Sequence, residues 1–148
     1  MDALGPGAGL WAVGSRVMGI VAGGGHAEYV CVHEREAMRV PHNLSWEEAG
    51  GVPEAFLTAY DALFRQLDLQ MGDRLLIHAV GSGVGTAAVQ LAKAASVRTI
   101  GTSRTEAKLR RAHELGLDVG IDASAGAWRE EVEAATDGQG VSAILDLV

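Results

Sequence analysis

The sequence predicts an α/β fold in which helices alternate with the strands of a doubly wound parallel sheet. Of the 148 residues, 48% are hydrophobic but only 5% are aromatic, a composition typical of buried parallel strands rich in Val, Ile and Leu. From residue 74 onward, short apolar runs alternate with amphipathic runs of about ten residues. This is the order of successive parallel strands and their crossover helices. A glycine-rich turn follows the first of these strands.

The N-terminal part is expected to hold little regular structure. Residues 1–11 are rich in glycine and show no periodic pattern. Residues 13–20 predict a turn into a short strand, and residues 27–32 predict a second strand. The three glycines at 23–25 predict a hairpin-type connection between the two strands.

A helix is predicted to begin near residue 46. Ser45 is followed three residues later by Glu48, which is the pattern of a capping box at a helix N-terminus. Apolar residues recur at helical spacing over residues 47–66. Pro53 lies within this stretch and predicts an interruption between a short first helix and a longer second one.

The rest of the chain is organised around the stretch that follows the turn at residues 70–73. The apolar run 75–80 predicts a buried strand, and glycines follow at Gly81, Gly83 and Gly85 before a helix of small residues begins. Such a turn allows close approach of a ligand, and the start of the helix offers free N–H groups and a positive dipole end. Together these features favour a diphosphate-binding site.

Three alternatives to a diphosphate site remain open for this loop. A nucleotide-binding P-loop is disfavoured because no Lys follows Gly85. The glycine spacing also resembles the first motif of S-adenosylmethionine-dependent methyltransferases, although that motif usually carries an acidic residue where this chain has His78. Thr86 stands where the dinucleotide fingerprint has Gly or Ala, and a glycine-rich turn can serve close packing alone.

The remaining elements complete the first half of a doubly wound sheet. Gly116 is expected to cap the second helix of this region at its C-terminus, and Asp137 with Gly138 predicts a turn. Right-handed crossovers order the four strands 3-2-1-4. Because such a sheet normally continues, both chain ends are expected to be truncations. The further strands are predicted at 97–102, 119–122 and 141–148, and the further helices at 106–115 and 127–136.

Charge and cysteine content exclude several classes of function. The net charge of −7 argues against a general surface for nucleic acid or anionic membranes. Cys31 is the only cysteine, so neither an internal disulfide nor a cysteine zinc cluster can form. No apolar stretch reaches the ~20 residues of a membrane span, and a cytoplasmic location is expected. The histidines lack ligand spacing and are interpreted as surface or core residues: His26, His33, His42, His78 and His113.

Five stretches covering almost the entire chain carry a family resemblance: GSRVMGIVAGGGHAEYV, VPEAFLTAYDAL, GDRLLIHAVGSGVGTAAVQLAK, LRRAHELGLDVGID and VSAILDLV. They resemble the zinc-independent quinone oxidoreductases of the medium-chain dehydrogenase/reductase superfamily, especially the tumour-suppressor-inducible type, with zeta-crystallin more distant. The resemblance implies a partial Rossmann-type NAD(P)-binding domain over residues 46–148, preceded by the C-terminal part of a GroES-like β domain over residues 1–45. It also implies a homo-oligomer at full length and a small, quinone-like substrate.

The resemblance also implies roles for individual residues. In relatives the segment around Thr58 packs beside the nicotinamide, where its hydroxyl could bond the carboxamide or its own helix backbone. Glu54 stands where zinc-dependent cousins carry a metal-binding cysteine, and no catalytic or metal-binding residue is assigned. Relatives show Ala-x-x-Gly-x-x-Gly in the phosphate loop, here with Ser82 at the middle glycine. The matching residues are Ala79, Gly81, Ser82, Gly83, Val84 and Gly85.

The residues after the second sheet strand favour NADPH over NADH. NAD enzymes place a carboxylate there for the ribose hydroxyl, whereas NADP enzymes place a cation for the 2′-phosphate. This chain has Ser103 and Arg104, with Lys108 one helical turn later, so a phosphate would meet a hydroxyl, a guanidinium and an ammonium. The alternative is that Arg104 and Lys108 lie on an ordinary solvated helix face.

We therefore expect an NADPH-dependent oxidoreductase that passes hydride to a quinone or to another electron-poor carbonyl or alkene. In such chemistry the cofactor carries the reaction, and the protein supplies orientation and hydrogen bonds. One alternative is a 2-enoyl thioester reductase of the same superfamily. Another is a non-catalytic role, as a dinucleotide sensor, a crystallin-like structural protein or a truncated inactive isoform.

Overall fold

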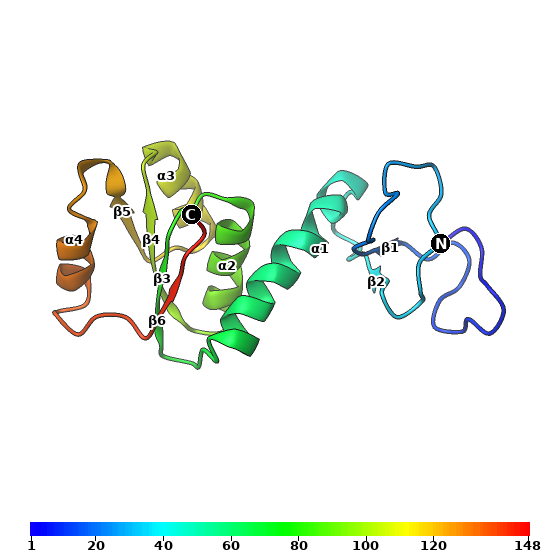
Figure 1. Ribbon diagram of the computed structural model, residues 1–148, viewed down its shortest axis with the longest axis horizontal. Coiled ribbons are helices and arrows are strands. Elements are labelled where there is room, and N and C mark those ends of the chain that lie inside the picture. Colours follow the sequence, from blue (N-terminus) through cyan, green and yellow to red (C-terminus); the bar gives the residue numbers. More distant parts are fainter. The chain divides into compact units, whose positions relative to one another are not determined.

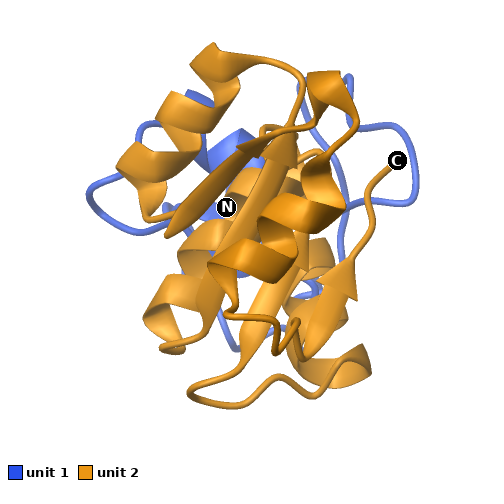
Figure 2. Ribbon diagram, turned by 90° about the vertical axis from the view of Figure 1, so that its left-hand side faces the viewer, with its two compact units in different colours: residues 1–54 blue, residues 55–148 orange.

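The computed structural model describes all residues from Met1 to Val148. The chain divides into two compact units, residues 1–54 and residues 55–148 (Figure 2). The domain boundary predicted between residues 45 and 46 falls at the start of helix α1 (Trp46–Tyr60), whereas the two units part within that helix.

The first unit has a single pair of short strands. Strand β1 (Val17–Met18) pairs antiparallel with β2 (Met38–Arg39), with Val17 opposite Arg39. The strand predicted within residues 13–20 is therefore present, but the strand predicted at 27–32 and its hairpin connection are wrong. Residues 27–32 are exposed, and no strand of the chain offers them the ladder hydrogen bonds that would hold them extended.

Helix α1 begins at the predicted capping box. The Glu48 N–H donates to the Ser45 hydroxyl at 3.2 Å, and the Ser45 N–H donates to the Glu48 carboxylate at 2.8 Å. The predicted interruption at Pro53 is wrong, because α1 runs through it. A proline removes one backbone hydrogen bond and bends a helix without having to end it. A π-helical segment, η1 (Asp61–Gln66), then continues the same run.

The second unit is built on a four-stranded parallel sheet (Figure 1). The strands lie in the order β5-β4-β3-β6, which confirms the predicted order 3-2-1-4. In register, Leu75 of β3 lies between Thr99 of β4 and Ala143 of β6. The bounds are Arg74–Ile77 for β3, Arg98–Ser103 for β4, Val119–Asp122 for β5 and Ala143–Leu145 for β6.

Two of the strands are shorter than predicted. Strand β3 ends at Ile77 rather than at residue 80, because the chain turns at Ala79, whose φ is +50°. Strand β6 covers three residues of the predicted 141–148, and it pairs with β3 alone. A strand bonded on one side has fewer ladder hydrogen bonds to extend it.

Helices cover both faces of the sheet. The side chains of β3 point alternately to the two faces of the sheet. Leu75 and Ile77 belong to the core beneath α2 (Gly83–Ala94) and α3 (Glu106–Leu115). Leu76 instead packs with Ile100, Ile121 and Val132 of α4 (Trp128–Ala135). Figure 1 shows α4 on the face opposite to α2 and α3. This is the doubly wound arrangement that alternate burial in parallel strands produces.

The connections of this sheet follow the predicted signals. Helix α3 ends at Gly116, whose φ of +113° is the left-handed conformation of a C-cap. A short 3₁₀ turn, η2 (Ala123–Ala125), joins β5 to α4. Because β3, β4 and β5 are parallel, the loops that follow them lie at one edge of the sheet, where ligands of such folds bind. None of the helices is long and apolar enough to span a lipid bilayer.

Candidate functional site

The glycine-rich loop is bonded to the end of the neighbouring strand. After β3 the Val80 N–H donates to the Thr102 carbonyl of β4 at 3.0 Å. The Ser82 N–H donates to the Ala79 carbonyl at 2.9 Å, which closes a tight turn. The loop that leaves β3 is therefore bonded to β4 and closed by its own turn.

Ser82 caps the helix that leaves the loop. It is the N-cap of α2, and its hydroxyl accepts the Gly85 N–H at 3.0 Å, a bond of the kind that stabilises helix N-termini. A serine at the middle-glycine position thus gives the loop a cap. The N–H groups of Gly83 and Val84, the first two of α2, have no backbone acceptor outside the helix. Free N–H groups at a helix N-terminus form an anion-binding site.

The three glycines of the loop have different surroundings. A Cβ atom on Gly85 would lie 2.7 Å from the Val80 carbonyl oxygen, and one on Gly81 would lie 2.6 Å from Cβ of Lys108. A Cβ atom on Gly83 would have no atom within 4 Å. Packing therefore requires glycine at two positions, whereas Gly83 faces open space at the start of the helix. Packing and ligand approach thus both act in this loop, at different residues.

A pocket of about 340 Å³ lies at this carboxyl edge of the sheet. Its lining residues come from the loop after β3, the end of β4, the start of α3, the turn after β5 and the last residue, Val148. Of the predicted site residues, it brings together Ala79, Ser103, Arg104 and Lys108.

The positive charges of this pocket have no acidic partner. Arg104 and Lys108 are both exposed, and neither takes part in an ion pair of the chain. By contrast, Arg110 on the same helix as Lys108 pairs with Glu106 at 2.6 Å. The Ser103 hydroxyl accepts the Thr105 N–H at 3.2 Å. Two unpaired cations in one pocket favour a phosphate-bearing ligand.

His78 also lines this pocket, although it was not predicted as a site residue. Its Nδ1 lies 2.9 Å from the Thr102 hydroxyl, and its ring meets Trp128 edge to face with centroids 4.8 Å apart. The signal that could have found it is its position directly after the central strand. Its partners come from β4 and α4, far away in the sequence.

Thr58 is not among the residues of the pocket. It lies on α1 with its side chain exposed, so its contact with a nicotinamide stays a prediction. Val84 is half-buried, and its side chain packs against the core beneath α2, which leaves its backbone N–H as the group able to meet a ligand.

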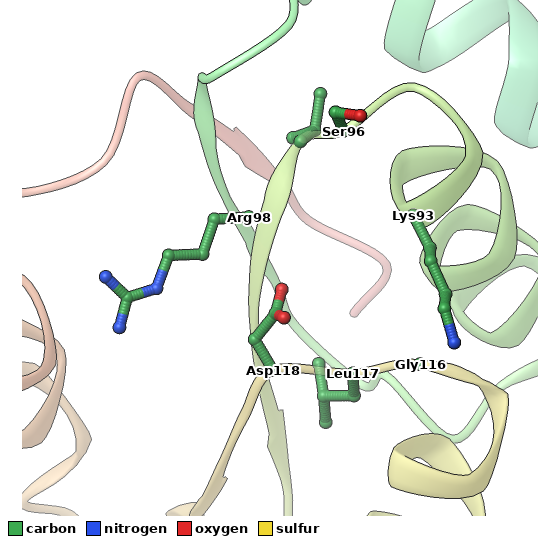
Figure 3. Close-up of a pocket in the computed structure, with 7 residues that line it drawn as sticks. Lys93, Ser96, Arg98, Gly116, Leu117 and Asp118 are labelled. Atoms are coloured by element: carbon green, nitrogen blue, oxygen red, sulfur yellow. The ribbon is translucent and has the colours of Figure 1, made fainter.

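A larger pocket, of about 480 Å³, lies at the opposite edge of the sheet, where β4 and β5 begin. Figure 3 shows the side chains of Lys93 and Arg98 pointing away from each other on either side of β4. The Asp118 carboxylate accepts both the Thr99 N–H at 2.7 Å and the Thr99 hydroxyl at 3.1 Å. The polar groups of this larger pocket therefore do not converge on a ligand. Doubly wound sheets bind their ligands at the carboxyl edge of the strands, which is the opposite edge.

Residues 83–148 match a family model described as zinc-binding dehydrogenase. A structural or catalytic zinc needs three or four His, Cys or carboxylate ligands. No group of three or more His, Cys, Asp or Glu side chains in the chain is placed to hold a metal ion. The residues present therefore do not fit a zinc ion.

The curated relatives include large polyketide synthases. Over 136 residues the chain is 36% identical to reducing polyketide synthase rads1 of Floropilus chiversii, an alignment that covers 90% of this chain and 6% of that protein. Over 148 residues it is 37% identical to the pikromycin synthase component PikAII of Streptomyces venezuelae, covering 99% of this chain and 4% of that protein. The chain thus spans a small part of these relatives.

Solved structures share the fold over most of this chain. The CurK enoyl reductase has a TM-score of 0.88 at 31% identity, covering 97% of this chain and 43% of that one. A mycobacterial protein complexed with NADPH has a TM-score of 0.83 at 32% identity, covering 97% and 45%. A quinone oxidoreductase of Pseudomonas syringae has a TM-score of 0.68 at 30% identity, covering 75% and 34%. The α/β fold with its parallel sheet is of the Rossmann type.

Proposed function

We propose that this chain, whose residues 83–148 match the zinc-binding dehydrogenase family model, is part of an oxidoreductase of the medium-chain dehydrogenase/reductase superfamily that binds NADPH and reduces an enoyl thioester. The observation that carries the cofactor assignment is the pair of unpaired cations, Arg104 and Lys108, in the pocket beside the open start of α2. A 2′-phosphate distinguishes NADPH from NADH, and cations at the end of this strand are where such a phosphate is recognised.

The residues of the chain fit this cofactor in two places. The free N–H groups of Gly83 and Val84 would hold the diphosphate, and the space beside Gly83 is open. The guanidinium of Arg104 and the ammonium of Lys108 would hold the 2′-phosphate. When bound, the nicotinamide supplies the hydride, and the protein binds and orients it. We assign no residue of this chain as an acid or a base.

The substrate class is proposed from the relatives. The two relatives named above are polyketide synthases, and one of the structures named above is an enoyl reductase. An enoyl thioester is an electron-poor alkene, so it falls within the class of acceptor expected from the sequence. The second candidate is a quinone, the leading expectation from the sequence, which the match to the Pseudomonas syringae quinone oxidoreductase favours.

Parallel calorimetric titrations with NADPH and NADH test the cofactor assignment. We expect tighter binding of NADPH, and a loss of about tenfold or more in NADPH affinity in Arg104→Gln with NADH affinity unchanged, because a charge-assisted bond contributes about 1.5–3 kcal/mol. Arg110→Gln is the matched control, since Arg110 is already paired with Glu106. Equal affinity for both dinucleotides, or binding of neither, would contradict the assignment.

The substrate is tested on the full-length protein that contains this chain. Loss of NADPH absorbance is followed with a short enoyl thioester of N-acetylcysteamine and, separately, with a simple benzoquinone. Turnover of the thioester alone supports the proposal. Turnover of the quinone alone would replace it with the second candidate, and retained binding without any turnover would support a non-catalytic role.

A further inference from the structure

His78 occupies a position where three elements meet. It follows the last residue of β3, it hydrogen-bonds to Thr102 of β4 with 2.9 Å between Nδ1 and Oγ1, and it packs edge to face on Trp128 of α4. The two rings are inclined by 81°, a favourable arrangement for aromatic pairs. The Arg129 guanidinium lies 5.3 Å from the Trp128 ring. The imidazole is therefore held on one side by packing and on the other by a hydrogen bond.

The Thr102 hydroxyl depends on this contact. Thr102 is only 3% exposed, and no buried side-chain polar atom of the chain lacks a hydrogen-bond partner. Leaving such a hydroxyl without its partner costs more than a typical hydrogen bond contributes. The backbone of Thr102 bonds to the same segment, because its carbonyl accepts the Val80 N–H at 3.0 Å. Both the side chain and the backbone of Thr102 are thus bonded to the segment that enters the glycine loop.

The residues that follow Thr102 include those that would bind the 2′-phosphate. Ser103 ends β4, and Arg104 begins the turn into α3. We propose that His78 is a positioning residue for cofactor choice. Through its bond to Thr102 it holds this turn at the pocket, so that Arg104 is available to the 2′-phosphate and NADPH is preferred over NADH. This inference rests on the proposed function and adds a residue that acts on the distinguishing phosphate through Thr102 and Arg104.

The test compares dissociation constants for NADPH and NADH in single variants of the whole chain. Loss of a hydrogen bond of about 1 kcal/mol corresponds to about fivefold, so His78→Leu is expected to weaken NADPH binding about fivefold and to leave NADH binding nearly unchanged. His78→Asn places an amide near the position of Nδ1 and should restore the preference. Thr102→Val removes the hydroxyl from the other side and should behave as His78→Leu does. The double variant should lose no more than either single variant.

The matched control is Thr99→Val. Thr99 is a buried threonine on the same strand, and its hydroxyl bonds to Asp118 at the opposite edge of the sheet. Its replacement should lower stability without changing the ratio of the two dissociation constants. A purely structural role for His78 would weaken both dinucleotides alike, whereas a positioning role changes the ratio. The Thr102→Val variant distinguishes positioning from a direct contact of His78 with the phosphate, since it leaves the imidazole in place and removes only the bond through which His78 acts.

The outcomes separate this inference from the proposed function. An NADPH-selective chain whose selectivity survives His78→Leu and Thr102→Val would overturn the inference and leave the proposed function standing. If the unaltered chain binds neither dinucleotide, or binds both equally, both proposals fall. Selectivity lost in His78→Leu, kept in Thr99→Val and restored in His78→Asn would support the inference.

Discussion

At the scale of single residues, the glycine loop combines two requirements that a sequence motif does not separate. Gly81 and Gly85 carry no side chain because α3 and the β3 loop carbonyls occupy the space beside them. Gly83 lies next to neither and leaves the start of α2 open. Glycine in this motif is therefore required by packing at two positions and leaves room for a ligand at the third.

A pair of alanine substitutions separates these requirements. Gly85→Ala should lower the free energy of unfolding by about 1–3 kcal/mol, as overpacking does, because its Cβ would lie 2.7 Å from a carbonyl oxygen. Gly83→Ala should leave stability unchanged or raise it slightly, since alanine restricts the unfolded chain, yet weaken both dinucleotides by filling their approach. Urea unfolding and calorimetry measure the two effects. A Gly85→Ala variant as stable as the unaltered chain would refute the packing requirement.

Asp73 makes stability depend on pH. Its carboxylate accepts the Gln70 N–H at 2.7 Å, and this bond, followed by one with the Ser142 side chain, lowers the pKa of Asp73 below its ordinary value of 3.8. Because the folded pKa lies below the unfolded one, this stabilisation is present above the unfolded pKa and is lost as pH falls through the folded pKa.

Asp73→Asn should therefore be less stable than the unaltered chain at neutral pH, with a difference that shrinks as pH falls below 3.8. Thermal unfolding at several pH values measures it. The other carboxyls with a lowered pKa, at Glu34, Glu47 and Asp122, remain in both proteins and cancel in the comparison. A difference that stays constant with pH would contradict this linkage.

At the scale of elements, local signals predicted what local interactions determine. The capping box at Ser45 and the C-cap at Gly116 are formed within a few residues, and both are found as predicted. The strand order follows from the handedness of crossovers. The strand predicted at 27–32 is absent because a strand needs hydrogen bonds from a neighbouring strand, and a local sequence pattern does not show whether such a neighbour exists. The predicted interruption at Pro53 was wrong because apolar residues at helical spacing continue on both sides of the proline. Their packing maintains the helix despite the loss of one backbone hydrogen bond.

The same distinction applies to the site. Arg104 and Lys108 could be predicted because their distance from the end of a strand is a local feature. The His78–Thr102 contact could not, because it depends on the side-by-side register of β3 and β4, in which Ile77 lies opposite Gly101. Likewise, which glycine is packed and which is open depends on where α3 crosses the loop.

The capping box should be measurable as an element of its own. Ser45→Ala is expected to lower the stability of the first turn of α1 by about 1 kcal/mol, the usual contribution of an N-cap side chain, and to speed hydrogen exchange of the Glu48 amide. Glu48→Gln should have little effect, since glutamine also completes a capping box. Equal effects of the two substitutions would show that the charge, rather than the reciprocal bonds, stabilises this turn.

At the scale of the whole molecule, the parallel sheet has two outer strands. Neither β5 nor β6 has a strand beyond it, so each leaves a row of backbone groups unpaired. On β6, Ile144 is 51% exposed and lies beside Leu76 of β3. An exposed apolar edge strand is a template for pairing with another chain.

We therefore expect the 148-residue chain to self-associate through β6. Size-exclusion chromatography with light scattering should show an average mass that rises with protein concentration. Ile144→Lys should shift the chain toward monomer, because a charge on an edge strand opposes strand addition. Met71→Lys is the control, since Met71 is an exposed apolar residue that lies in the turn before β3 and is not part of an edge strand. If Met71→Lys were as effective as Ile144→Lys, association would depend on general surface hydrophobicity, and a monomer at every concentration would exclude pairing at this edge.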